Sequence, residues 1–165
     1  MILLFLELIN NKIEFGILER RNLNLSSTNR SRLRDLHIAD YYRTPINEII
    51  NFLDKFIIDE KVPVQKNIKI LEPCAGGLIG KDKMSYVEAL HNCGLGMHHG
   101  INTIDIRENS LADIKGNYLD MDCKNKYDMI TTNPPFNIAL DVIRKALDDV
   151  KDNGYVNYAI KIKLP

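Results

Sequence analysis

Residues 67–77 read Asn-Ile-Lys-Ile-Leu-Glu-Pro-Cys-Ala-Gly-Gly, an apolar run that ends in a turn with proline and glycine. The run at 67–71 predicts a strand, because strong turn formers follow it at once. In open parallel sheets, a strand that leads into a glycine-containing turn commonly forms a ligand-binding corner. The stretch therefore predicts an α/β fold with a candidate site at 72–77.

Strand-like and helix-like segments alternate from residue 45 to the end of the chain. Apolar runs predict strands at 67–71, 102–106, 127–131 and 155–162, a short element at 117–119, and helices at 46–57, 84–91 and 138–150. Thr44 suits the N-cap of the first helix and Pro45 its first turn. The alternation predicts crossover connections and a parallel sheet with sites at the carboxyl ends of its strands.

Composition limits the class of protein. The chain has 165 residues, of which 45% are hydrophobic, so it is long enough for one domain with a core and short for two. Its three cysteines are widely spaced, which argues against a disulfide framework or a structural zinc site and favours a reducing, cytoplasmic compartment. The pair His98 and His99 lacks a third ligand at useful spacing, so no metal is expected.

Residues 1–40 are interpreted as an N-terminal extension, with one strand or short helix and then an irregular arm, and residues 41–165 as the core domain. Glu7 interrupts the opening apolar stretch, which is too short to span a membrane and lacks the features of a signal peptide. The arm holds an arginine cluster that predicts a solvated loop or a phosphate-contacting arm: Arg20, Arg21, Arg30, Arg32 and Arg34. The formal net charge of zero argues against strong unaided DNA binding.

The tetrapeptide Asn133-Pro134-Pro135-Phe136 follows the predicted strand at 127–131. An exocyclic amine on a purine is a weak nucleophile, because its lone pair is delocalised into the ring. The Asn133 amide oxygen and the Pro134 carbonyl can accept the hydrogens of such an amine, and Phe136 offers a flat surface to an extruded base. Asparagine and proline are also common turn formers, so the tetrapeptide alone could simply end a strand.

Four separated segments, Tyr42–Pro45, Glu72–Gly77, Asp105 and Asn133–Phe136, resemble in their order the S-adenosylmethionine-dependent amino-methyltransferases. The resemblance is to adenine-N6 DNA enzymes and related proteins of phages and mobile elements, and it covers residues 41–162. It implies a Rossmann-like class I methyltransferase fold, with a mostly parallel sheet and helices on both faces. The implied activity is methyl transfer to adenine N6 in DNA.

The resemblance also implies residue roles. Asn133, Pro134, Pro135 and Phe136 would be catalytic, Asp105 would accept hydrogen bonds from both ribose hydroxyls, and the glycine loop would let backbone approach the cofactor. The implied residues that bind S-adenosyl-L-methionine are Tyr42, Thr44, Pro45, Glu72, Pro73, Cys74, Ala75, Gly76, Gly77, Asp105, Asn117 and Tyr118.

Two features depart from the family pattern. Asn117 stands where the family has an aspartate that contacts the adenine ring of the cofactor, so Asp120 or Asp122 could take over that contact. The chain also ends at the fifth predicted strand, whereas the family continues with two more strands and a target-recognition region. We therefore expect a truncated sheet with an exposed edge at that strand.

Three alternatives remain at this point. The same acceptors suit RNA guanine N2 or adenine, or a protein glutamine amide. The neutral charge and the missing strands suit a non-catalytic remnant that only binds the cofactor. A Rossmann oxidoreductase is disfavoured, because no Gly-x-Gly-x-x-Gly follows the first predicted strand. DNA is the expected partner, RNA is possible, no membrane is involved, and the oligomeric state stays open.

Overall fold

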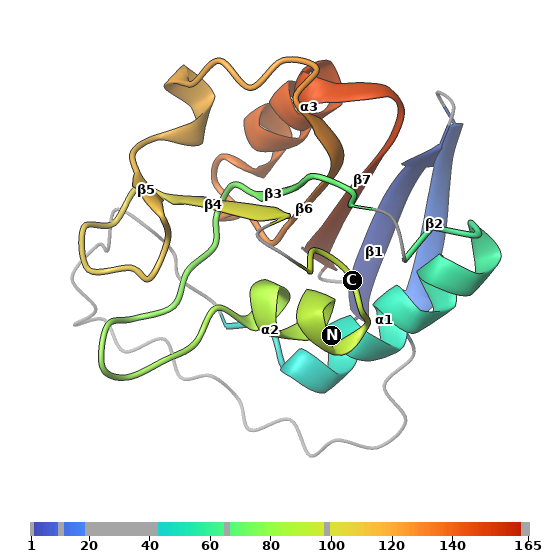
Figure 1. Ribbon diagram of the computed structural model, residues 1–165, viewed down its shortest axis with the longest axis horizontal. Helices are drawn as coiled ribbons and strands as arrows, with labels where there is room; N and C mark the ends of the chain where they lie inside the picture. Colours follow the sequence, from blue (N-terminus) through green and yellow to red (C-terminus); the bar gives the residue numbers. More distant parts are fainter. Residues whose placement is uncertain (1, 10–11, 19–42, 65–66, 98–99, 163–165) are drawn as a thin grey trace.

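The computed structural model describes residues 2–9, 12–18, 43–64, 67–97 and 100–162, and for 2–9, 12–18 and 159–162 it describes only the backbone. Tyr42, the arginine cluster of the arm, His98 and His99 therefore lie outside the described residues. The strands form one seven-stranded sheet in the order β2-β1-β7-β6-β3-β4-β5 (Figure 1).

Five neighbouring strands of this sheet are parallel, as the alternation predicts. They are β3 (Ile70–Glu72), β4 (Ile101–Asp105), β5 (Ile114–Lys115), β6 (Tyr127–Thr132) and β7 (Val150–Ile162). The helices are α1 (Ile46–Asp59), α2 (Ser85–Asn92) and α3 (Ala139–Asp149), with a 3-10 helix, η1, at Tyr118–Asp120. The α/β class is thus confirmed, and the arrangement is compatible with a Rossmann-like fold.

Helices cover both faces of the sheet because the central strands are apolar on both faces. Ile70 of β3 and Met129 of β6 pack against α1 and α2, which lie together on one side. Their neighbours Leu71 and Ile130 point to the other side and pack against α3. Figure 1 shows α3 on the side of the sheet opposite α1 and α2. The period of two along each strand therefore divides the core into two clusters.

The N-terminal extension contributes two strands, β1 (Ile2–Ile9) and β2 (Lys12–Leu18), rather than one. β1 runs antiparallel to β7, and β2 runs antiparallel to β1. The prediction of an exposed edge at the last strand is therefore wrong, because β7 is an interior strand. A free β7 would have a long row of unpaired backbone groups, and pairing with β1 satisfies them.

Two local predictions also need correction. The element expected at 117–119 is η1, and the strand before it has only two residues, which is too short to show a period. Thr44 does not cap α1, since Pro45 occupies the N-cap position and no side chain donates or accepts a capping hydrogen bond there.

Among the described helices, none combines the length and the apolar character needed to cross a membrane.

Candidate functional site

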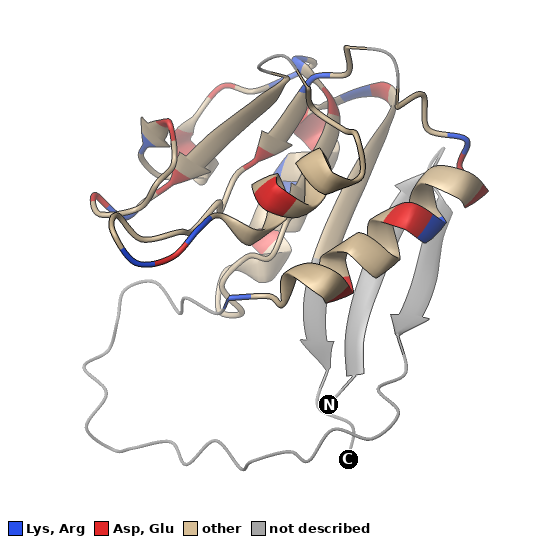
Figure 2. Cartoon of the chain, turned by 60° about the horizontal axis from the view of Figure 1, so that its bottom comes forward, with Lys and Arg blue, Asp and Glu red and all other residues tan. Residues whose placement is uncertain are grey.

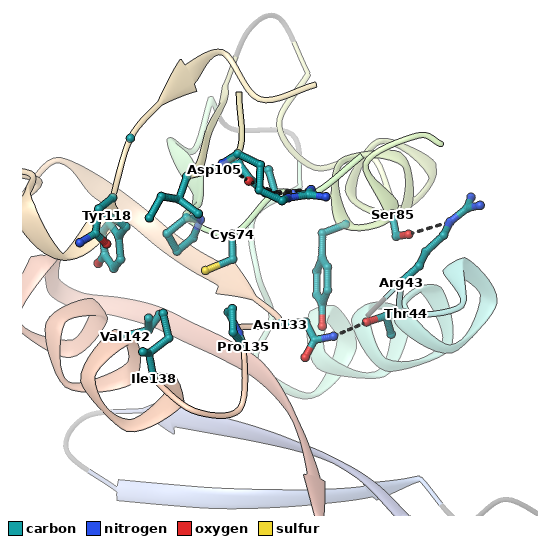
Figure 3. Close-up of a pocket in the computed structure, with 18 residues that line it drawn as sticks. Arg43, Thr44, Cys74, Ser85, Asp105, Tyr118, Asn133, Pro135, Ile138 and Val142 are labelled. Atoms are coloured by element: carbon teal, nitrogen blue, oxygen red, sulfur yellow. Dashed lines mark hydrogen bonds and ion pairs between the residues drawn. The ribbon is translucent and has the colours of Figure 1, made fainter. Parts of the chain in front are cut away.

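A cavity lies where the strand order reverses. β4 and β5 lie on one side of β3, whereas β6 and β7 lie on the other, so the loops after β3 and β6 diverge and leave a crevice at their carboxyl ends. Figure 3 shows side chains from these loops, from the segment before α1 and from α3 directed toward this crevice. The residues predicted from the sequence that line it are Thr44, Pro73, Cys74, Ala75, Gly76, Asp105, Asn117, Tyr118, Asn133 and Pro135.

Other predicted residues are near the cavity without lining it. These are Pro45, Glu72, Gly77, Pro134 and Phe136. Pro134 is buried and Phe136 is 41% exposed. Several lining residues were not predicted: Arg43, Ser85, Tyr86, Ile106, Arg107, Gly116, Ile138 and Val142. Arg43, Ile106, Arg107 and Gly116 could have been suspected because each is next to a predicted residue in the sequence. Ser85, Tyr86, Ile138 and Val142 come from segments whose packing the sequence does not show.

Asp105 is the most heavily hydrogen-bonded group of the cavity. Asp105 is 6% exposed, and its carboxylate accepts the backbone N–H groups of Gly76 and Arg107, both at 2.8 Å. The Arg107 guanidinium adds Nε at 3.0 Å and Nη2 at 3.2 Å, and Nη2 also donates to the Gly77 carbonyl at 3.1 Å. A carboxylate has about four lone-pair sites, so a ribose diol could reach this one only if Arg107 moved.

The glycine loop has a backbone conformation that explains its composition. Gly76 has φ 67 and Gly77 has φ 70, in the left-handed region that side chains rarely adopt. This conformation presents the Gly76 N–H to Asp105. At Gly77, an added Cβ would lie 3.0 Å from Met84 Cγ and 3.1 Å from Leu111 Cβ, so space also favours glycine there.

Glu72 lies behind this loop as a buried acid. Its Oε1 accepts the Cys74 N–H at 3.2 Å, while its Oε2 is buried and has no hydrogen-bond partner among the described residues. Burial raises the pKa of Glu72 from 4.5 to about 8, opposed in part by the nearby Thr132 hydroxyl and the Cys74 amide. Burial and the neighbouring Glu72 charge likewise raise the pKa of the Cys74 thiol to about 12. Both groups are therefore neutral at pH 7.

Asn133 and Thr44 both line the cavity and contact each other there. The Asn133 Nδ2 donates to the Thr44 Oγ1 at 2.9 Å, and Thr44 is 2% exposed (Figure 3). The bond joins the loop after β6 to the segment before α1. That segment is also tied to α2, because the Arg43 Nε donates to the Ser85 Oγ at 3.3 Å.

Asn117 and Tyr118 have structural contacts that restrict their predicted roles. The Asn117 side chain caps η1, since its Oδ1 accepts the Leu119 N–H at 3.2 Å and its Nδ2 donates to Asp120 Oδ2 at 2.9 Å. The Tyr118 hydroxyl donates to Asp149 Oδ2 at 2.8 Å. The Tyr118 ring is therefore held against α3, where it forms an apolar wall.

The cavity lining combines an apolar wall, a bent glycine loop, one carboxylate (Asp105) and two side-chain amides (Asn117 and Asn133). As it stands, the cavity has a volume of about 80 Å³, below the roughly 300–1,000 Å³ typical of pockets for small ligands. The Arg107 side chain, which is 20% exposed, also lines it. In the part of the chain that the structure describes, no group of three or more His, Cys, Asp or Glu side chains is placed to hold a metal ion.

No model of a known protein family matches the chain, and no curated protein matches it either.

Proposed function

We propose that this protein transfers a methyl group from S-adenosyl-L-methionine to the exocyclic N6 amine of adenine in DNA. The observation that carries the proposal is the convergence of separate segments on one cavity. Thr44, the loop after β3, Asp105 and Asn133 are far apart in the sequence, yet each lines the cavity at the strand-order reversal. That is the place where open α/β sheets bind ligands.

The residues present fit a methyl donor with an amino-acid end and an adenosine end. Glu72 would hold an ammonium group on condition that the glycine loop moves to expose it and that its carboxyl ionises, because it is buried behind the cavity lining and its pKa is raised to about 8. Ile106 and the Tyr118 ring give an apolar surface for a flat base. Asp105 would hold the ribose hydroxyls, on condition that Arg107 releases its carboxylate. The donor would supply an electrophilic methyl group, and the chain's residues would do the positioning.

Asn133 would act on the amine that receives the methyl group. Its Nδ2 points to Thr44, so its Oδ1 is the end of the amide that can accept a hydrogen from the amine. Holding the amine at this oxygen orients its lone pair and supports the positive charge that develops on nitrogen. Phe136 is exposed outside the cavity lining, where a base approaching from solvent could stack on it.

The proposal of a DNA adenine as substrate rests on the tetrapeptide Asn133–Phe136 and not on surface charge. Figure 2 shows basic and acidic residues interspersed along the described chain, so charge does not single out a nucleic acid as the partner. RNA bases and a protein glutamine amide should therefore be tested in the same assay as DNA. A protein that binds the cofactor without methyl transfer is the second candidate, favoured by the formal net charge of zero, which argues against strong unaided binding of nucleic acid.

The test is transfer of a labelled methyl group from S-adenosylmethionine to unmethylated DNA, RNA and a glutamine-containing peptide, with the modified position mapped. Asn133→Ala should abolish transfer while calorimetric binding of the cofactor survives. Asn51→Ala, on the exposed side of α1, is the matched control and should behave as the parent. Equal transfer by Asn133→Ala and the parent would refute the proposed role. Binding without any transfer would favour the second candidate.

A further inference from the structure

The contact between Thr44 and Asn133 joins two segments that the sequence separates by 89 positions, at a donor–acceptor distance of 2.9 Å. Thr44 has fixed neighbours on both sides. It is 2% exposed, and the next residue, Pro45, is the N-cap of α1 and accepts the Glu48 and Ile49 N–H groups at its carbonyl. The preceding residue, Arg43, donates to Ser85. The hydroxyl that meets Asn133 is therefore a fixed point of the site.

The contact with the Thr44 hydroxyl matters for the orientation of the Asn133 side chain, because an asparagine amide has two unlike ends. The oxygen accepts hydrogen bonds and the nitrogen donates them, and rotation by half a turn exchanges the two. Only the orientation with Oδ1 toward the substrate can accept a hydrogen from an amine. In the structure, Nδ2 faces Thr44 and Oδ1 is the end directed away from it (Figure 3).

We propose that Thr44 is a positioning residue for the transfer reaction: its Oγ1 accepts the Asn133 Nδ2–H and so stabilises the amide in the orientation that the structure shows, with its oxygen toward the substrate amine. This inference rests on the proposed function and deepens it. It also assigns Thr44 a role other than contact with the methionine end of the cofactor. The two roles differ measurably, because loss of a cofactor contact raises KM for the cofactor, whereas a misoriented Asn133 lowers kcat at saturating cofactor.

Three variants separate the roles. Thr44→Val removes the acceptor with almost no change of shape, and Thr44→Ser keeps the hydroxyl. Thr131→Val is the matched control, because the Thr131 hydroxyl lies in β6 two residues before Asn133 and is buried without a hydrogen-bond partner among the described residues. Urea denaturation of each variant confirms that it is folded before the other measurements.

The first readout needs no activity. Nitrogen-15 NMR of the side-chain amides, with Asn133 assigned by its loss in Asn133→Ala, measures how fast its Nδ2 hydrogens exchange with water. Exchange should be at least about tenfold faster in Thr44→Val, because the hydrogen bond from Nδ2 to the Thr44 hydroxyl is lost. Thr44→Ser and Thr131→Val should match the parent.

The second readout is kinetic. In Thr44→Val, kcat for methyl transfer should fall by about tenfold or more while KM for S-adenosylmethionine stays within about twofold, and Thr44→Ser should restore kcat. An unchanged Asn133 exchange rate in Thr44→Val, or a raised KM with unchanged kcat, would overturn the positioning role. A parent protein that transfers no methyl group to any substrate would instead overturn the proposed function and this role with it, and the exchange rates would show whether the Thr44 bond exists.

Discussion

The buried acid Glu72 gives a prediction whose size can be worked out from the structure. Glu72 is fully buried at the end of β3, and its raised pKa means that the folded protein keeps a proton that the unfolded chain loses. Below pH 4.5 the carboxyl is neutral in both states. Between pH 4.5 and about 8 only the unfolded chain is ionised, so the free energy of unfolding falls as pH rises.

The magnitude follows from the size of the shift. At about 1.4 kcal/mol per pKa unit, a rise from 4.5 to about 8 corresponds to a loss of roughly 5 kcal/mol across this window. That is comparable to the whole stability of many small domains, about 5–15 kcal/mol. Glu72→Gln keeps the shape of the side chain and cannot ionise. The free energy of unfolding of the variant should therefore not fall across this window. The difference between the variant and the parent in this free energy should grow with pH up to about 8.

The assay is urea denaturation followed by circular dichroism at a series of pH values across the window. Glu108→Gln removes an exposed carboxyl and is the matched control, expected to follow the parent curve. Parallel curves for the parent and Glu72→Gln would refute the reasoning, since they would mean that folding does not change the ionisation of Glu72.

Three further predictions concern the walls of the cavity. Arg107→Met should raise the affinity for S-adenosylmethionine by about tenfold in calorimetry, because Asp105 then has free lone pairs; a weaker affinity would mean that Arg107 helps to bind the ligand. Gly76→Ala should lower the free energy of unfolding by about 1 kcal/mol or more, because alanine at φ 67 is strained, and an unchanged urea midpoint would contradict this. Cys74 should react with iodoacetamide far more slowly than the cysteines of the unfolded chain at pH 8, because its pKa is raised to about 12; equal rates would show that the pKa of this thiol is not raised.

Much of the fold could be predicted because its segments carry strong local signals. The first helix was expected at 46–57 and spans Ile46–Asp59, and the strand expected at 127–131 spans Tyr127–Thr132. The helix shows apolar residues at its period, the strand is a short apolar run, and proline stands at or near a boundary of each. The convergence of the strand ends followed from the parallel sheet alone.

The remaining features depend on contacts between distant residues. The pairing of β1 with β7 is a long-range contact that no local pattern specifies, so the N-terminal strands were assigned to an extension. The Asp105 carboxylate was expected to face a ligand, yet Arg107, two residues later, turns back onto it. Thr44 was expected to cap a helix, and instead it meets Asn133. Each of these depends on where a polar side chain finds its partner in three dimensions.

The central claim is that one cavity holds the methyl donor beside Asn133. A crystal structure of the full chain with S-adenosylhomocysteine, the demethylated form of that donor, tests it most directly. We expect the ligand between the glycine loop and Asp105, with Arg107 displaced and the sulfur toward Asn133. A ligand bound elsewhere, such as the hollow beside Asp128 and Lys151, or no ligand at saturating concentration, would contradict the account.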